Sequence, residues 1–356
     1  MSSPTADTPA TGTFVTDEAL KRLKKRHAAE MRFKFYGRAA IGIAIIALVT
    51  LLVSIFGQAS SAFSRYVLSY DLNIEASYVD PEGTRDPQAI ERNVSGFNLM
   101  LQDQLADEFL SEDPSRNVQR ELYGLFTRLA VLPIAHHTAQ NMQTIGTEQV
   151  FNVALADDID LYLKGGVTQR KSLDLSGLSR VSGSVESGVT LVLGTQEDAA
   201  RLNEALTSLT RQDVEDSSAA ALIQAGQTWF RMENAEGRTL QLTYLAGART
   251  LPQADASVEA LVLAQSQENR TVTDRQIAWT MILKEQGRIK SVLNTSLFTN
   301  SDSTYPELAG TAAAVVGSLL TMLVTALLAI PVGIFAAVYL EEFAPRNRLT
   351  SLIEGN

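Results

Sequence analysis

Two uncharged, apolar stretches decide the fold: AAIGIAIIALVTLLVSIF at residues 39–56 and LAGTAAAVVGSLLTMLVTALLAIPVGIFAAVYL at residues 308–340. The first lies within 26 consecutive uncharged residues, and the second consists of 33. About 20 apolar residues are enough to cross the hydrocarbon of a bilayer. Both stretches therefore predict transmembrane helices, which we place at residues 39–63 and 307–340.

The second stretch is longer than one crossing requires. As a straight helix its 33 residues would measure about 50 Å, whereas the hydrocarbon core is roughly 30 Å thick. The helix is therefore expected to tilt, kink or extend beyond the bilayer. Pro331, two residues before Gly333, is the predicted place for a kink.

Two other interpretations of these stretches exist. Buried core helices are disfavoured, because such helices rarely exceed about 15 residues without a polar face. A cleavable signal peptide is an alternative for the first stretch, since Ala59, Ser60, Ser61 and Ala62 follow it. Its apolar core is longer than the usual core of about 7–15 residues and its basic leader is long, which favours an uncleaved anchor.

Basic residues flank each predicted span on one side. Eight lysines and arginines precede the first span within residues 1–38, and Arg346 and Arg348 follow the second. The positive-inside rule then places residues 1–38 and 341–356 in the cytoplasm and residues 64–306 outside, in the periplasm of a Gram-negative cell. The predicted location is the cell inner membrane, as a multi-pass protein with a cytoplasmic N-terminus.

The N-terminal segment has two parts. Residues 1–16 are small and polar with two prolines, which is typical of a disordered tail. We interpret residues 17–38 as the charge cluster that sets the orientation, and a basic helix near the lipid headgroups is the alternative.

The charge and the cysteine content limit the partners and the chemistry. Between Arg65 and Asp302 there are 20 lysines and arginines against 32 aspartates and glutamates. This acidic balance argues against nucleic acid as a partner, because nucleic acid binds to a basic surface. The chain has no cysteine, so disulfide and thiolate chemistry are excluded as well.

The external region, residues 64–306, mixes helical and strand periodicities and predicts an α+β domain. Two apolar sets have helical spacing: Phe97, Met100, Leu101, Leu105 and Phe109, and Val118, Leu122, Leu125, Phe126 and Leu129. Two sets alternate as in strands: Phe151, Val153 and Leu155, and Ile159, Leu161 and Leu163, which end at Gly165-Gly166.

Further elements follow along the chain. We expect a strand over residues 188–194, a helix over residues 196–209 and a hairpin over residues 227–246 that turns at residues 234–237. A last helix is expected to start at Thr273–Asp274 and to stop at Gly287.

No group of residues in the sequence supports an enzyme, so we predict no catalytic, cofactor-binding or metal-binding residues. His27 is isolated, and the adjacent His136 and His137 lack a metal-binding spacing. The sequence also lacks a G-x-S-x-G nucleophile motif and a P-loop.

Two short motifs have ordinary interpretations that we prefer. Asp157, Asp158 and Asp160 lack the glycine and glutamate of an EF-hand loop, so we interpret them as a solvated strand end rather than a calcium site. Lys164-Gly165-Gly166 is interpreted as a turn after a strand rather than an anion-binding loop.

The polar residues of the second span lie along one side of a helix, among small residues. They are Thr311, Ser318, Thr321 and Thr325, accompanied by Gly310, Ala313, Ala314 and Gly317. Small and hydroxylated side chains allow helices to approach closely in lipid. The second span is therefore expected to pack against other helices.

Two C-terminal stretches are similar to a known family. Residues 272–310 (VTDRQIAWTMILKEQGRIKSVLNTSLFTNSDSTYPELAG) and 331–356 (PVGIFAAVYLEEFAPRNRLTSLIEGN) resemble the PstA permease subunits of phosphate ABC transporters. The resemblance depends on Phe298–Ser303, Pro306–Gly310 and the ordered runs PVG, AAVYLEE and AP. It is closest to the subgroup with a large periplasmic insertion, which residues 64–270 resemble more weakly, in layout and composition.

The resemblance implies the start of an ABC type I importer permease fold and inorganic phosphate as the substrate. Residues 307–340 would be the first core helix, with Pro331 and Gly333 near its cytoplasmic end and Glu341-Glu342 at its exit. The implied partners are a second, PstC-like permease subunit, a cytoplasmic ATPase dimer, a periplasmic phosphate-binding protein and the lipid bilayer. The residues that bind phosphate stay unknown.

Permeases of this family continue through several more helices and an EAA-type coupling loop, and neither occurs before Asn356. We therefore expect a fragment, from a truncated or split permease, that does not transport phosphate alone. One helix cannot enclose a path for an anion in lipid.

Two other functions share this layout. The leading alternative is a two-span membrane receptor with a periplasmic sensory domain. The long, threonine-lined second span with its proline and the lack of an amphipathic connector after it disfavour a receptor. A two-span scaffold without a ligand is the third interpretation.

Overall fold

The computed structural model describes residues 17–111, 114–210, 218–254, 256–300 and 310–343, and for residues 17–30 and Gln58 it describes the backbone only. The predictions for residues 1–16, 301–309 and 344–356 lie outside the described residues. The chain divides into two compact units, residues 1–61 and 62–356.

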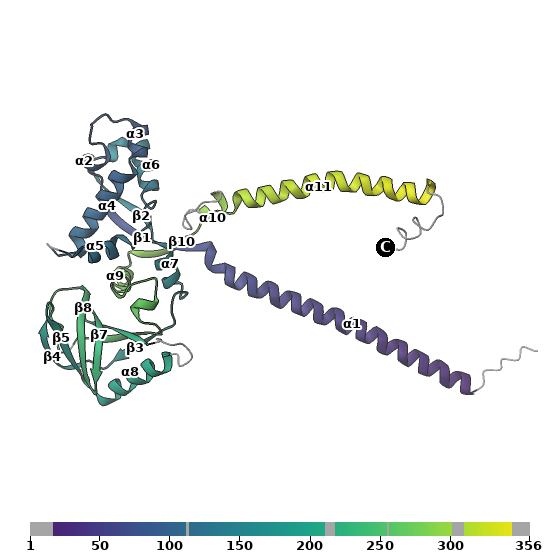
Figure 1. Ribbon diagram of the computed structural model, residues 1–356, viewed down its shortest axis with the longest axis horizontal. Helices are drawn as coiled ribbons and strands as arrows, with labels where there is room; N and C mark the ends of the chain where they lie inside the picture. Colours follow the sequence, from purple (N-terminus) through teal and green to yellow (C-terminus); the bar gives the residue numbers. More distant parts are fainter. Residues whose placement is uncertain (1–16, 112–113, 211–217, 255, 301–309, 344–356) are drawn as a thin grey trace, which may run out of the picture. The chain divides into compact units, whose positions relative to one another are not determined.

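Two long apolar helices flank a mixed α/β domain (Figure 1). Helix α1 (Asp17–Ala59) is continuous, so the basic residues 17–38 belong to the same helix as the first apolar stretch. A 3-10 turn, η1 (Ser60–Phe63), follows it. Helix α11 (Ala312–Val338) continues through Pro331 with a gentle bend and is followed by a π-helical turn, η5 (Tyr339–Phe343).

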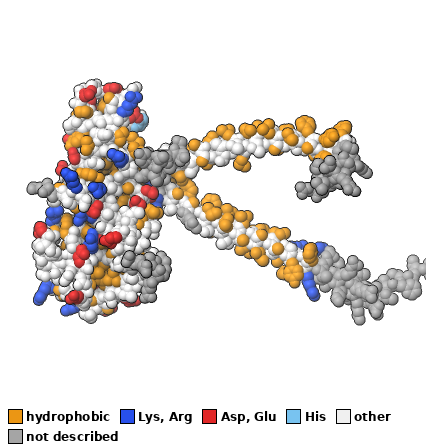
Figure 2. All heavy atoms as spheres, viewed as in Figure 1, with side chains coloured by type: hydrophobic (Ala, Val, Ile, Leu, Met, Phe, Trp, Pro, Cys, Tyr) orange, Lys and Arg blue, Asp and Glu red, His pale blue; other side chains and the backbone are white. Residues whose placement is uncertain are grey.

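The large apolar side chains of Met31–Phe63 and Ala312–Phe343 are exposed, as Figure 2 shows for one face of each helix. The stretches Met31–Phe63 and Ala312–Phe343 are long and apolar enough to cross a membrane, and no part of their most apolar windows is buried in the protein. They are therefore not core helices of this chain, because a core helix buries its apolar face. At 27 residues, α11 is about 40 Å long, which still exceeds the roughly 30 Å of the hydrocarbon core.

The helical part of the domain lies in sequence between β1 (Ser64–Asn73) and β2 (Glu148–Ala154). Its elements are α2 (Ala76–Val79), α3 (Pro87–Arg92), α4 (Val94–Phe109), α5 (Arg116–Tyr123), α6 (Leu132–Gln140) and the 3-10 turn η2 (Met142–Thr144). Helix α4 confirms the first predicted helical face and buries Phe97, Met100, Leu101 and Leu105.

The second predicted helical face is correct only as far as Tyr123, where α5 ends. Gly124 closes the helix, as glycines often do. Leu125 and Phe126 are buried beyond it, where Phe126 forms an isolated β-bridge with Leu155, and Leu129 lies in a turn. Leu125 and Phe126 pack in the same hydrophobic core as Leu122 of α5, although they do not belong to a helix.

Strand β2 confirms the predicted strand at Phe151 and Val153, but the next predicted strand is wrong. Ile159, Leu161 and Leu163 belong to helix α7 (Asp157–Leu163). Ile159 and Leu163, four residues apart, are buried on one helical face, whereas Leu161 is 43% exposed.

The carboxylates of Asp157, Asp158 and Asp160 therefore lie in the first turn of a helix and not at a strand end. Negative side chains stabilise that end of a helix, because its free N–H groups carry partial positive charge. Lys164 and Gly165 form the predicted turn after it, with Gly165 at a φ of 85° that glycine adopts readily.

All ten strands in the described residues pair antiparallel, in two sheets. The first has the order β10-β1-β2, with β10 at Ile289–Leu293. The second has the order β3-β9-β6-β7-β8-β5-β4. Its strands are β3 (Arg170–Leu175), β4 (Leu178–Ser184), β5 (Gly188–Leu193), β6 (Ala220–Ala225), β7 (Thr228–Glu236), β8 (Thr239–Gly247) and β9 (Val258–Leu263).

Several predictions for this region are confirmed. Strand β5 matches the predicted strand, and β7 and β8 form the predicted hairpin. Its turn lies at residues 237–238 and not at residues 234–237, because β7 continues to Glu236, which pairs with Thr239. Helix α8 (Gln196–Leu209) has the predicted bounds. Helix α9 (Asp274–Glu285) begins at the capping box formed by Thr273 and Gln276. The chain then passes Gly287, whose φ is 70°.

The larger sheet has apolar side chains on both faces, because successive residues of a strand point to opposite sides. Trp229 and Leu222 belong to one hydrophobic core, which includes the helical part of the domain and α9. Phe230 and Ile223, their neighbours in sequence, belong to a second core with Leu202 of α8. Figure 1 shows α8 along one side of this sheet.

A buried ionic network fixes the start of α9. The carboxylate of Asp274, 2% exposed, accepts from the Arg231 Nε at 2.6 Å and from the fully buried Arg270. The Gln267 Oε1, in the 3-10 turn η3 (Gln267–Asn269), accepts from Arg231 and from the Asp274 N–H. Removing one partner of a buried pair is costly, because the remaining charge keeps no compensation.

Asp274→Asn is therefore expected to lower the free energy of unfolding by about 3 kcal/mol, because Arg270 stays buried without a counter-charge. Asp107→Asn, at an exposed position of α4, is the matched control and should change it by less than about 0.5 kcal/mol. Fluorescence-monitored unfolding of the full chain in detergent measures both, since its only two tryptophans, Trp229 and Trp279, are buried in the domain. Equal stability of the two variants would contradict the role of the Asp274 network in stabilising the domain.

Candidate functional site

The chain enters and leaves the domain at adjacent points. Strand β1 pairs with β10 from Ser64 opposite Leu293 onwards. The Asn294 N–H donates to the Phe63 carbonyl at 2.8 Å, and its side-chain amide donates to the Ala62 carbonyl at 3.2 Å, across 232 positions of sequence. The start of the domain is thereby joined to the segment that leads to α11.

The departing segment is held in the same place. Helix α10 (Ser296–Thr299) follows β10, and the Leu297 carbonyl accepts from the Thr311 N–H at 2.8 Å and from its hydroxyl at 3.0 Å. A Cβ on Gly310 would lie 2.1 Å from the Asn300 carbonyl oxygen, so only glycine fits this approach. Thr311 is the last residue before α11.

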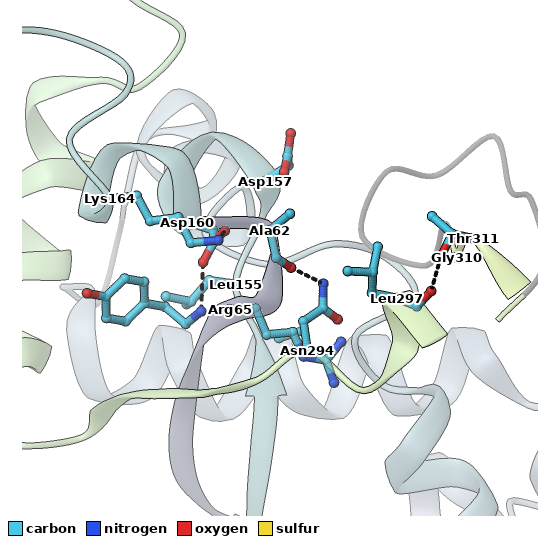
Figure 3. Close-up of a pocket in the computed structure, with 12 residues that line it drawn as sticks. Ala62, Arg65, Leu155, Asp157, Asp160, Lys164, Asn294, Leu297, Gly310 and Thr311 are labelled. Atoms are coloured by element: carbon cyan, nitrogen blue, oxygen red, sulfur yellow. Dashed lines mark hydrogen bonds and ion pairs between the residues drawn. The ribbon is translucent and has the colours of Figure 1, made fainter. Parts of the chain in front are cut away.

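A cavity of about 320 Å³ opens where these segments meet (Figure 3). Its lining comes from the start of β1, the end of β2, α7 and the segment after β10. The lining residues are Ala62, Arg65, Tyr66, Ala154, Leu155, Asp157, Asp160, Lys164, Asn294, Leu297, Gly310 and Thr311. Four charged side chains are among them, two of each sign.

One pair of these charges is fully engaged with protein. The Lys164 Nζ donates to the Asp160 carboxylate at 2.5 Å and to the Ser64 carbonyl at 2.6 Å. The other Asp160 oxygen accepts from the Tyr66 N–H at 2.7 Å. The Lys164 side chain is 16% exposed and the Asp160 side chain is 14% exposed. The pair therefore fixes α7 to the first residues of β1.

The other charges and polar groups keep free hydrogen-bonding capacity. The Arg65 Nη1 donates to the Ser296 hydroxyl at 3.2 Å. The Arg65 Nε and the Asn294 Oδ1 are buried and have no hydrogen-bond partner among the described residues. Because Arg65 pairs with Val292 and strand residues alternate, Arg65 and Asn294 share one face of the sheet.

Asp157 makes no hydrogen bond or ion pair with another described residue. Partial burial raises the pKa of its carboxyl, and the neighbouring carboxylates of Asp160 and Asp158 raise it further, against the opposing effect of Lys164. Asp157 lines the same cavity as Arg65 and Asn294, and in Figure 3 its carboxyl points away from these two side chains. The cavity thus offers a donor and an acceptor that the protein itself leaves unused.

The structure brings together some of the residues that the sequence highlighted and separates others. Asp157, Asp160 and Lys164 line the cavity, whereas Asp158 does not. His136 is exposed and contacts Glu91 and Gln140, and His137 packs edge-on against Phe151. Among the described residues, no group of three or more His, Asp or Glu could hold a metal.

Arg65 and Asn294 were not predicted as site residues. Each lies near a signal that the sequence does contain: Arg65 is the first charged residue after the first apolar stretch, and Asn294 lies seven residues after Gly287, where the last helix was expected to stop. Their proximity depends on the pairing of β1 with β10, which no local pattern indicates.

These features define a mixed α/β domain between two apolar helices that are long enough to span a membrane. Residues 20–172 match a family model described as a domain of unknown function, DUF3333. The matched segment covers under half of the chain and includes Arg65, Asp157, Asp160 and Lys164. No curated protein and no solved structure matches the chain.

Asp157→Asn is expected to be more stable than Asp158→Asn at pH 7. Both variants lose the same favourable interaction with the start of α7, and at Asp157 the substitution also removes a carboxyl whose pKa is raised by folding. An ionised group with a raised folded-state pKa opposes folding above that pKa, and an amide removes this penalty.

The stability difference should therefore be present at neutral pH and shrink as the pH falls through the folded-state pKa toward the ordinary value of 3.8. Tryptophan-monitored thermal unfolding across this pH range measures it. A difference that is independent of pH would contradict the prediction.

Proposed function

We propose that this chain belongs to a permease subunit of an ATP-driven importer that moves inorganic phosphate across the cell inner membrane into the cytoplasm. The observation that carries the proposal is the similarity of residues 272–310 and 331–356 to PstA permease subunits. Phosphate as the substrate comes from this resemblance alone.

The adjacent entry and exit of the chain support a domain inserted between two membrane crossings. Ser64 and Leu293 are paired, so α1 and the segment leading to α11 connect to the same end of the domain. Two helices attached to one end of a domain can enter one bilayer from the same side. With basic residues at both far ends, this arrangement favours an external domain and cytoplasmic termini.

The residues on which the resemblance depends have structural roles in this connection. Phe298 stacks on Phe63, with ring centroids 5.9 Å apart. Gly310 permits the close approach to Asn300 that precedes α11. Phe298 and Gly310 therefore make specific contacts in the segment that would join the external domain to the first core helix of the permease. These contacts support the proposal because they give the residues of the resemblance a structural role.

Helix α11 is suited to contact other helices in lipid. The Thr321 and Thr325 hydroxyls donate to the carbonyls four residues earlier at 2.8 Å, so these polar groups are satisfied within the helix. Ala313, Gly317, Thr321 and Thr325 follow one another at intervals of four residues, the spacing of small residues at helix contacts. The proposed partner is a second, PstC-like permease subunit, together with an ATPase dimer and a periplasmic phosphate-binding protein.

Uptake of radiolabelled phosphate by phosphate-starved cells tests the function. Deleting the gene that encodes this chain should abolish the ATP-dependent component of uptake, and restoring the gene should return it. Uptake that is unchanged by the deletion would remove the proposal. A changed transcriptional response to phosphate with unchanged uptake would favour the receptor.

Gly317→Leu is expected to reduce recovery of the second permease subunit with the tagged chain by at least about tenfold, because the added side chain prevents close helix packing. Ala326→Leu is the matched control, since it adds a leucine half a turn away on the same helix, nine residues further on. Co-purification in mild detergent measures both variants. Equal recovery would show that this side of α11 makes no subunit contact.

A further inference from the structure

We propose that the cavity at the base of the domain binds the headgroup of a zwitterionic lipid with a primary ammonium, of the phosphatidylethanolamine type. This inference rests on the proposed membrane location of the two apolar helices. It does not depend on phosphate as the transported substrate.

The charge balance of the cavity indicates the ligand class. Lys164 and Asp160 neutralise each other and are bound to backbone groups of β1. Among the described lining residues, the charges left for a ligand are one guanidinium, Arg65, and one carboxylate, Asp157. A ligand that carries one negative and one positive charge matches both.

A free phosphate ion fits these groups poorly. At neutral pH it carries more than one negative charge on average, whereas Arg65 supplies one uncommitted positive charge and Asp157 repels an anion. A phosphodiester carries a single negative charge. Its oxygens can accept from the buried, unpartnered Arg65 Nε, in a charge-assisted hydrogen bond.

The other end of the headgroup must supply N–H donors. Asp157 and the unpartnered Asn294 Oδ1 are both acceptors. A primary ammonium has three N–H donors, whereas the trimethylated ammonium of phosphatidylcholine has none. Phosphatidylglycerol has no cation. The site therefore predicts a preference for phosphatidylethanolamine over both other lipids.

The position of the cavity agrees with a headgroup ligand. Ala62 lies three residues after the end of α1, and Thr311 directly precedes α11. Three residues of chain reach at most about 11 Å, which keeps the cavity close to the span ends. The polar layer on each side of the hydrocarbon is roughly 5–8 Å thick.

Exposed apolar side chains accompany the cavity at this end of the domain. Phe63 is 40% exposed, its stacking partner Phe298 is 55% exposed and Leu293 is 64% exposed. They lie beside the lining residues Ala62, Leu297 and Asn294 in sequence. Aromatic and aliphatic groups at this depth suit the glycerol and upper acyl region of a lipid.

Native mass spectrometry of the full chain, released from nanodiscs of defined composition, tests the proposal. The probes are dioleoyl phosphatidylethanolamine, phosphatidylcholine and phosphatidylglycerol in separate equimolar competitions, and inorganic phosphate added alone. Phosphatidylethanolamine should be retained at least about tenfold over either other lipid, since a hydrogen bond to a charged group contributes about 1.5 kcal/mol or more.

Asp157→Asn should abolish the preference for phosphatidylethanolamine over phosphatidylcholine, because the amide removes the charge of a lining carboxylate that makes no ion pair with another described residue. Asp158→Asn, the neighbouring position outside the cavity, should retain it. Arg65→Gln should lower retention of the lipid phosphates. Lipid-dependent shifts of the unfolding midpoint, read from tryptophan fluorescence, confirm that each variant is folded.

Equal retention of phosphatidylethanolamine and phosphatidylcholine by the parent chain would overturn the proposal. So would the same effect from Asp157→Asn and Asp158→Asn, or tighter binding of inorganic phosphate than of any lipid. If the parent chain shows no lipid preference but still supports phosphate uptake, the lipid proposal is refuted and the proposed transport function is not. A chain that stays soluble without detergent would refute the membrane location on which both proposals depend.

Discussion

The pairing of β1 with β10 is the constraint on which the rest of the structure depends. It joins residues more than about 220 positions apart, such as Ser64 with Leu293 and Leu68 with Ile289. Closing so long a loop costs conformational entropy, although the cost grows only slowly with loop length. Burial of β1 residues such as Leu68 and Leu72 in the first core offsets it. The domain is thereby closed at the end where the two apolar helices attach.

This closure also creates the cavity. Strand β1 brings Arg65, β10 leads to Asn294, and α7 is held against β1 by Lys164 and Asp160. A cluster built only for stability would pair every charge, because unpaired buried polar groups oppose folding. Here the Arg65 Nε and the Asn294 Oδ1 stay without partners, and the pKa of Asp157 is raised. Unused polar capacity of this kind is common where a protein binds a ligand.

Local patterns predicted the elements whose signals are local. The capping residues Thr273–Asp274 indicated the start of α9, for which Thr273 is the N-cap, and the bounds of α8 were predicted correctly. Residues 159–163 were misassigned, because Ile159, Leu161 and Leu163 fit a strand while Ile159, Tyr162 and Leu163 fit a helix. The carboxylates in the first turn and the positive φ of Gly165 favour the helix.

The candidate site was largely beyond the reach of sequence patterns. The densest acidic cluster did contribute Asp157 and Asp160, although as a helix start rather than a strand end. Strand β1 alternates between apolar and polar residues from Leu68 to Asn73, whereas β10 does not alternate clearly, and nothing local pairs Arg65 with the segment around Asn294. Long-range strand register arises from the packing of the whole core, which a pattern of a few residues does not contain.

The central claim is that the α/β domain lies outside the membrane between two crossings. The absence of natural cysteines makes single-cysteine labelling direct. Ser187→Cys, in the exposed turn between β4 and β5, and Met31→Cys, on the basic side of the first apolar stretch, are treated with a membrane-impermeant maleimide. The account predicts labelling of Ser187→Cys in intact cells and of Met31→Cys only after lysis. Labelling of Ser187→Cys only after lysis would contradict it.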